Sequence, residues 1–366
     1  MIKIATVVGA RPQFVKAAVL SRAFREFPEI DEFIIHTGQH HDASMSEVFF
    51  QEMEIPQARY NLGINKETLK AGEQAPAFVL GKTVQEISRV LLQEKPRWVL
   101  VYGDTDSTLA GALAAAKNGT PLIHVEAGLR SYNHLMPEEL NRVLTDRMSE
   151  LLFCPTDRAV RNLQEEGFDH TSTKIFRCGD PMQDAALYYA KKSKPIVNVT
   201  LPDNFILCTI HRNENTSNPT ILRQIFQALE QIAESMPVVM PLHPGTRKRL
   251  LENGYDFTRS PIRFIEPVGY FEMIYLLQHS RFVMTDSGGV QKEAYFFGKM
   301  CLTLREETEW TELIDNHCNI IVGRETNKIT ETAAILWNEP GKTFVPGLYG
   351  KGDAGMEIVR TIIQNS

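Results

Sequence analysis

The sequence predicts an α/β protein made of two doubly wound, Rossmann-like domains that face each other across a cleft. The chain has 366 residues, which is more than one hydrophobic core of ordinary size holds. Short apolar runs alternate with helical patterns, and this plan occurs twice along the chain. The runs are continuously apolar, as expected for parallel strands that helices cover on both faces.

The predicted elements follow one another in a regular order. The first half has apolar runs at residues 2–8, 32–37, 98–102, 121–126, 151–154 and 174–178, with helical patterns at 12–26, 106–118, 138–149 and 156–166. The second half has runs at residues 205–210, 238–242, 262–266, 281–285, 301–304 and 319–322. In sheets of this kind, ligands bind beyond the carboxyl ends of the strands.

A polar, proline-containing segment, residues 188–204, separates the two halves. We therefore expect an N-terminal domain over residues 1–187 and a C-terminal domain over residues 188–352. The last helix, within residues 353–366, has no strand to accompany it, so we expect it to pack back on the N-terminal domain.

Composition limits the partners that this chain is expected to have. The formal net charge is −6, which does not favour a general surface for nucleic acid or for anionic membranes. No apolar run approaches the roughly 18 residues of a membrane span, and the first residues lack the apolar region of a signal peptide, so we expect a soluble cytoplasmic protein. The five cysteines have no CxxC spacing, and we expect reduced thiols rather than disulfides or a zinc site.

The segment "TDSGGVQKEA" contains a candidate anion site directly after the run at 281–285. Gly288 and Gly289 have no side chains, so backbone N–H groups at a helix start can approach an anion. Glu293 falls about one turn into that helix, where a carboxylate can accept a ribose hydroxyl. No Walker or GxGxxG pattern is present, and a simple helix-capping turn is an equal alternative.

The segment "VVGARPQFVKAA" follows the first predicted strand. Arg11 and Lys16 lie near the start of a helix and can bind phosphate, Arg11 as a planar fork and Lys16 as a point charge. Taken singly, either residue is explained more simply as an exposed side chain of a surface helix.

Asp104 and Glu126 are candidates for catalytic carboxylates, because each lies at the end of an apolar run. Asp104 and Asp106 follow the run at 98–102, and we expect Asp106 to be the N-cap of the next helix. Asp104 is then the better candidate. Glu126 ends an apolar run, a position that is costly unless the carboxylate is paired or functional.

"MPEELNRVLTD" places Glu138, Glu139 and Arg142 on one predicted helix. At least one of the two glutamates is expected only to start the helix with a favourable charge.

Two histidines of the second half, His211 and His243, each lie just beyond a predicted strand and precede an arginine. One such histidine is more often structural, but two of them favour a rim that faces phosphate. We see no spacing typical of metal ligands, of a GxSxG elbow or of a Cys–His pair, so no metal is expected. Acid/base chemistry on a neutral ring attached to a diphosphate fits best.

Six motifs occur in order over nearly the whole chain: "GARPQFVKA", "GDTDSTLAGALAA", "HVEAGLRS", "PEELNR", "HRNEN" and "TDSGGVQKEA". Together they make the chain resemble the non-hydrolysing UDP-N-acetylglucosamine 2-epimerases. The resemblance implies the GT-B-like arrangement of two domains, a cytoplasmic homodimer, and no need for a metal or a redox cofactor.

The resemblance also implies a mechanism. UDP leaves C1 by anti elimination with loss of the C2 proton, and UDP then adds back while a proton reaches the other face of C2. Asp104, Glu126 and Glu138 are the implied acid/base groups, with His211 near the pyrophosphate. The residues expected to hold UDP are Arg11, Lys16, Arg142, His243, Ser287, Gly288, Gly289 and, at the ribose, Glu293.

The chain differs from the usual family pattern in three ways. Bacterial enzymes acting on UDP-GlcNAc usually carry a "QHREM"-like segment that helps to bind a second, activating substrate, and this chain has "GQHHDASMSEVFF" there. "TEWTE" replaces the usual "TERPE", so Trp310 stands in place of an arginine. Third, these two stretches, together with "GARPQF" and "GYFEMIYLL", are similar to the branch that epimerises UDP-2,3-diacetamido-2,3-dideoxy-glucuronic acid for O-antigen and other surface polysaccharides. The alternatives are a hydrolysing epimerase, a GT-B glycosyltransferase and an inactive UDP-sugar sensor.

Overall fold

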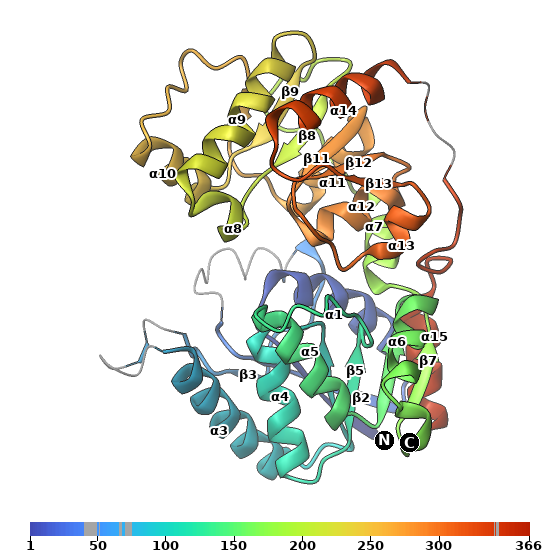
Figure 1. The fold of residues 1–366 in the computed structure, drawn as a ribbon. Helices are drawn as coiled ribbons and strands as arrows, with labels where there is room; N and C mark the ends of the chain where they lie inside the picture. The colour runs from blue at the N-terminus through green and yellow to red at the C-terminus, as the bar shows by residue number, and fades with distance from the viewer. Residues whose placement is uncertain (40–49, 51, 66–67, 70–74, 340, 342–343) are drawn as a thin grey trace. The chain divides into compact units, whose positions relative to one another are not determined.

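The structure, a computed structural model, describes residues 1–39, 50, 52–65, 68–69, 75–339, 341 and 344–366. Most of the stretch "GQHHDASMSEVFF", residues 40–49, lies outside the described residues. The chain forms two compact units (Figure 1). Unit 1 contains residues 1–185 and 347–366, and unit 2 contains residues 186–346.

Unit 1 is built on a seven-stranded sheet with the strand order β3-β2-β1-β4-β5-β6-β7. Every neighbouring pair is parallel. The strands are β1 (Ile2–Val8), β2 (Ile30–His36), β3 (Tyr60–Asn61), β4 (Trp98–Tyr102), β5 (Leu122–Val125), β6 (Leu151–Cys154) and β7 (Lys174–Arg177). All six predicted runs are strands, and among the described residues of unit 1 the two-residue β3 is the one strand that was not predicted.

Unit 2 repeats this plan with a six-stranded parallel sheet in the order β10-β9-β8-β11-β12-β13. Its strands are β8 (Ile206–Thr209), β9 (Val238–Pro241), β10 (Arg263–Ile265), β11 (Phe282–Thr285), β12 (Cys301–Thr303) and β13 (Asn319–Ile321). The prediction of two doubly wound, Rossmann-like domains is therefore confirmed.

Helices flank both sheets. Those of unit 1 are α1 (Arg11–Phe24), α3 (Pro76–Glu94), α4 (Asp106–Lys117), α5 (Pro137–Met148), α6 (Asp157–Glu165), the 3₁₀ turn η1 (Phe168–His170) and α15 (Ala354–Gln364). Those of unit 2 are α8 (Asn213–Thr216), α9 (Pro219–Ala233), α10 (Pro244–Glu252), α11 (Tyr270–His279), α12 (Gly288–Phe296), α13 (Thr311–Asp315) and α14 (Thr326–Asn338). Among the described residues, no helix has the length and apolarity needed to cross a bilayer.

Successive residues of one strand explain why the runs are continuously apolar. Ile206 and Cys208 of β8 pack in one core cluster with Phe226 of α9, while Leu207 packs in another cluster with Leu277 of α11. Helices α9 and α14 lie side by side over the first of these faces (Figure 1). Because successive side chains of a strand point to opposite faces, both of which are covered, every position must be apolar.

The units divide inside helix α7 (Pro181–Ala190) and not in the polar segment that follows it. Tyr189 of α7 is fully buried, and its ring lies 5.4 Å from that of Phe271. The chain returns to unit 1 at Gly347, where the carbonyl of Tyr349 accepts the N–H of Asp180 at 2.8 Å. The boundaries expected at residues 187 and 352 thus fall at residues 185 and 346.

Candidate active site

The start of α1 in unit 1 is shaped by the close packing of Gly9 and by the hydrogen bonds of Gln13. A Cβ on Gly9 would lie 2.1 Å from both the Oγ of Ser107 and the Oγ1 of Thr37, so only glycine lets these loops meet. Buried Gln13 accepts the N–H of Gly9 at 2.8 Å and donates to the carbonyl of Tyr102 at 3.1 Å. These contacts fix the helix that carries both predicted phosphate ligands of the N-terminal motif.

Lys16 and Glu126 form a buried ion pair at the carboxyl edge of the unit 1 sheet. Glu126 follows β5 with a φ of 73°, which is uncommon for a residue with a side chain. Gly103 follows β4 with a φ of 61°, and a Cβ there would lie 3.0 Å from the Glu126 carboxylate. The turns after β4 and β5 therefore converge on this pair. Arg11, by contrast, is exposed at the first residue of α1.

Asp104 lies one residue beyond Gly103 and pairs with Arg142 of α5. Its side chain keeps 29% of its surface exposed, whereas Arg142 is buried and also donates to Glu139 at 2.7 Å. Two cations that were expected to hold phosphate, Lys16 and Arg142, are thus each paired with a candidate acid.

The prediction that Asp106 caps the next helix was wrong by one residue. Thr105 is the N-cap, and its hydroxyl accepts the N–H of Thr108 at 3.3 Å. Asp106 is the first helical residue, and its carboxylate instead accepts the amide of Asn141 on α5 at 3.1 Å.

The two adjacent glutamates of α5 differ in their surroundings. Glu139 is buried and accepts the N–H groups of Ser131 at 2.9 Å and Tyr132 at 3.0 Å. Burial acts to raise the pKa of Glu139, but these hydrogen bonds and the charge of Arg142 outweigh it and hold the pKa below its usual value. Glu138 is only partly buried and accepts no hydrogen bond from the described residues. Glu139 is therefore structural, and Glu138 is the more available carboxylate.

In unit 2 the two glycines of "TDSGG" have different requirements. Helix α12 has Ser287 as its N-cap and Gly288 as its first residue. A Cβ on Gly288 would lie 2.5 Å from the Oε1 of Glu309, so a larger residue there would have to displace the end of the Glu309 side chain. A Cβ on Gly289 would have the Oγ of Ser287 as its nearest neighbour, at 4.0 Å. The contact with Glu309 accounts for Gly288, but neither this packing nor a capping turn explains Gly289.

The acid of this motif, Asp286, turns inward. It is fully buried and accepts the N–H groups of His211 at 3.1 Å and Arg212 at 3.0 Å, and the amide of Asn215 at 3.1 Å. The Nδ1 of His211 lies 3.4 Å from the same carboxylate, while 40% of its side chain is exposed. Asp286 therefore holds the loop "HRNEN" so that the imidazole of His211 reaches the surface.

His243 completes a rim of histidines in unit 2. Its Nδ1 accepts the N–H of Gly245 at 3.1 Å, which caps α10, and its ring lies 5.9 Å from that of His211. The two predicted histidines therefore come together, next to the starts of α8 and α10.

Glu293 is buried on the second turn of α12, and the ammonium of Lys292 lies 4.0 Å from the centre of the Trp310 ring.

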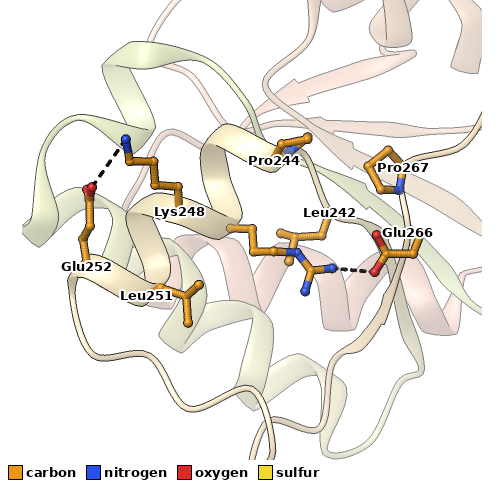
Figure 2. Close-up of a pocket in the computed structure, with 8 residues that line it drawn as sticks. Leu242, Pro244, Lys248, Leu251, Glu252, Glu266 and Pro267 are labelled. Atoms are coloured by element: carbon orange, nitrogen blue, oxygen red, sulfur yellow. Dashed lines mark hydrogen bonds and ion pairs between the residues drawn. The ribbon is translucent and has the colours of Figure 1, made fainter. Parts of the chain in front are cut away.

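An open pocket of about 540 Å³ runs along α10 (Figure 2). Leu242, Pro244 and Pro267 line it with apolar surface, the ion pair of Arg247 and Glu266 bounds it, and Lys248, Leu251 and Glu252 complete the lining. None of the residues predicted for the site lines this pocket. Its charged residues pair with one another, so it offers no net preference for an anion.

One of the two glutamates of α5 was expected to be structural, but the contacts of Glu139 with a neighbouring turn were not predicted, nor were those of the buried residues Gln13 and Asp286. Each of them accepts backbone N–H groups from a neighbouring turn. The only signal in the sequence was their position inside motifs that were assigned to ligands, such as the glutamine of "GARPQ" and the aspartate of "TDSGG".

Comparison with known proteins identifies the family. Residues 22–363 match the family described as UDP-N-acetylglucosamine 2-epimerase. The chain belongs to this family. It is 49% identical to the UDP-2,3-diacetamido-2,3-dideoxy-D-glucuronate 2-epimerase of Pseudomonas aeruginosa, over 97% of this chain and 98% of that protein. It is 40% identical to the UDP-N-acetylglucosamine 2-epimerase of Methanocaldococcus jannaschii, over 98% of each chain.

Solved structures of UDP-N-acetylglucosamine 2-epimerases have the same fold. The M. jannaschii enzyme in complex with UDP-GlcNAc and UDP has a TM-score of 0.89 at 38% identity, covering 99% of this chain and 100% of that one. The Neisseria meningitidis enzyme bound to UDP-GlcNAc has a TM-score of 0.88 at 31% identity, covering 100% of both chains. The resemblance drawn from the motifs is confirmed, and the chain is an enzyme of the isomerase class.

Proposed function

We propose that this chain is a non-hydrolysing 2-epimerase of a UDP-linked 2-acetamido sugar. The observation that carries this proposal is the placement of Asp104 and Glu126 after the neighbouring strands β4 and β5, each beside a cation. Two carboxylates at neighbouring strand ends can act on the same substrate carbon, one to remove a proton and the other to deliver one.

The proposed reaction begins with removal of the C2 proton by a carboxylate and departure of UDP from C1 with the electrons of the C1–O bond. A 2-acetamidoglucal remains. UDP then adds back at C1, and a proton reaches C2 from the opposite face. Asp104, Glu126 and Glu138 are the proposed acid/base groups, and Asp104 and Glu138 are suited to exchange protons with solvent because both are partly exposed.

Retention of UDP between the two half-reactions requires donors for a diphosphate. In unit 2 we assign this role to the N-terminus of α12 at Ser287, Gly288 and Gly289, and to the rim of His211 and His243. A helix start with accessible N–H groups attracts phosphate through hydrogen bonds and the helix dipole. In unit 1 the proposed ligands are Arg11, Lys16 and Arg142, and Glu293 of unit 2 is proposed to bind the ribose.

For the sugar, we propose UDP-2,3-diacetamido-2,3-dideoxy-D-glucuronate, which is converted to its manno isomer. The relative named for this sugar is 49% identical to the chain, and the M. jannaschii relative named for UDP-GlcNAc is 40% identical. The product would be a precursor of surface polysaccharide such as O-antigen. We further propose that the enzyme is a homodimer of the cytoplasm, which light scattering of the purified protein and cell fractionation would check.

Proton NMR in D₂O with each of the two UDP-sugars tests the proposal. The expected result is a manno epimer with deuterium at C2, formed from the diacetamido-uronate substrate. Release of free UDP with an unlinked sugar would instead support a hydrolysing epimerase. Transfer of the sugar to an added acceptor, without deuterium at C2, would support a GT-B glycosyltransferase.

A further inference from the structure

A buried group of charged side chains contacts the turns that carry the two candidate acids of unit 1, Asp104 and Glu126. His124 of β5 and Asp146 of α5 are fully buried, and the Nδ1 of His124 lies 2.7 Å from the carboxylate of Asp146. Arg130 donates to the same carboxylate at 2.7 Å. None of the three belongs to the acid/base or UDP-binding groups proposed above.

Asp146 ties together both ends of the turn that carries Glu126. It binds His124, two residues before Glu126, and it accepts the N–H of Gly128, two residues after, at 3.2 Å. Glu126 and Gly128 have φ angles of 73° and 77°. A residue with a side chain is held in that region only where its surroundings enforce it, so the turn needs such anchors.

The second ring nitrogen of His124 reaches the turn that carries Asp104. Its Nε2 lies 2.8 Å from the carbonyl of Gly103, and the N–H of Gly103 donates to the carbonyl of Val125 at 3.0 Å. Both backbone polar groups of Gly103 are therefore bound to β5. One buried imidazole thus links the turn of Asp104 to the turn of Glu126.

Charge strengthens this connection. Burial acts to raise the pKa of Asp146, but the hydrogen bond and charge of His124 and the charge of Arg130 outweigh it and hold the pKa below its usual value. A carboxylate and a carbonyl oxygen therefore lie against the two ring nitrogens of His124. A buried ring held between these two oxygens fixes the positions of both.

We propose that Asp146 and His124 are positioning residues for the epimerisation, because they fix the turns of Asp104 and Glu126 relative to each other. This inference rests on the proposed function, since it assumes that these two carboxylates transfer protons. A small displacement of a reacting group lowers the rate strongly while it leaves the binding of a remote part of the substrate unchanged. UDP, which carries no reacting carbon, is such a part.

The test compares Asp146→Asn with a matched control, Glu166→Gln. The Nε and Nη2 of Arg130 donate to the carboxylate of Glu166 at 2.6 Å and 2.9 Å, so Glu166 belongs to the same charged group. It makes no contact with the turns of Asp104 and Glu126 among the hydrogen bonds of the described residues. We expect Asp146→Asn to lower kcat on the order of 10- to 100-fold, with KM and the Kd of UDP within about threefold. Glu166→Gln is expected to keep kcat within about threefold.

Hydrogen exchange of backbone amides provides a readout that does not depend on activity. Peptides that cover residues 103–104 and 125–128 should exchange faster in Asp146→Asn and not in Glu166→Gln. If Asp146→Asn does not fold, His124→Gln, which leaves Asp146 paired with Arg130, makes the same comparison.

Two outcomes separate the inference from the function on which it rests. Equal losses of kcat in both variants, in proportion to their loss of stability, would overturn the positioning role. A wild-type enzyme that exchanges no C2 proton of either UDP-sugar would overturn the proposed function, and the exchange of the amides would still report whether Asp146 holds the two turns.

Discussion

The turns after β4 in unit 1 and after β11 in unit 2 look alike in sequence, because each places an aspartate close behind an apolar strand. Asp104 keeps 29% of its side chain exposed and pairs with Arg142, whereas Asp286 is fully buried and accepts backbone N–H groups of the "HRNEN" loop. The first arrangement leaves a carboxylate partly open to solvent, and the second uses a carboxylate to hold the backbone of another loop. The neighbouring loops decide which of these roles an acid at a strand end takes.

The largest expected effect is the loss of kcat when a proposed acid/base carboxylate is replaced by its amide. Asp104→Asn should lower kcat by roughly 10²- to 10⁴-fold, because the amide cannot take or give the proton, while UDP still binds. Glu126→Gln should behave in the same way. Steady-state kinetics and calorimetric titration with UDP measure the two quantities. A kcat close to that of the wild type would remove the altered residue from the acid/base set.

The next prediction concerns stability. Asp286→Asn should lower the free energy of unfolding on the order of 3 kcal/mol, because the N–H groups of His211 and Arg212 and the amide of Asn215 lose a buried, charged acceptor. Asp104→Asn should lower it by about 1 kcal/mol or less, since that pair is partly exposed. Urea unfolding of both variants gives the comparison, and equal losses would contradict the distinction between the two turns.

A third acid, Asp184, is expected to make the stability of the protein depend on pH. Asp184 of α7 is buried, and burial raises its pKa to about 6, although its carboxylate accepts the N–H of Gly355 at 2.8 Å. The pKa of Asp184 in the folded state exceeds that in the unfolded state. The contribution of Asp184 to the free energy of unfolding is therefore complete at low pH, and it is lost as the pH rises through 6.

Asp184→Asn should therefore gain stability relative to the wild type by about 2 kcal/mol between pH 4.5 and pH 7, since one pKa unit corresponds to about 1.4 kcal/mol. Chemical unfolding at the two pH values measures this difference. A constant difference between variant and wild type would show that Asp184 does not titrate in this range.

The smallest effect tests the two glycines at the start of α12. Gly289→Ala should leave the unfolding free energy unchanged or slightly higher, because no atom crowds the new methyl group and alanine favours helix. It should nevertheless raise the Kd of UDP by about tenfold, or about 1.4 kcal/mol, if a phosphate approaches this backbone. Gly288→Ala is the comparison variant, because its methyl group would have to displace the carboxylate of Glu309. An unchanged Kd for UDP in Gly289→Ala would reduce "TDSGG" to a capping turn.

Much of the fold could be predicted because parallel strands covered on both faces leave an unmistakable run of apolar residues. Asp104 and Glu126 could be found for the same reason, since each follows such a run. The partners could not, because Lys16 lies 110 residues from Glu126 along the chain, and Arg142 lies 38 residues from Asp104. Nor could the inward turn of Asp286, which depends on a loop that follows the neighbouring strand β8.

The central claim is that UDP leaves C1 and returns during epimerisation. Positional isotope exchange tests it most directly, with ¹⁸O placed in the bridge between C1 and the β-phosphorus of the UDP-sugar. The account predicts that the enzyme moves the label into the non-bridging positions of the β-phosphate, which ³¹P NMR detects, while deuterium enters at C2. Epimerisation at C2 with the label fixed in the bridge would contradict the account.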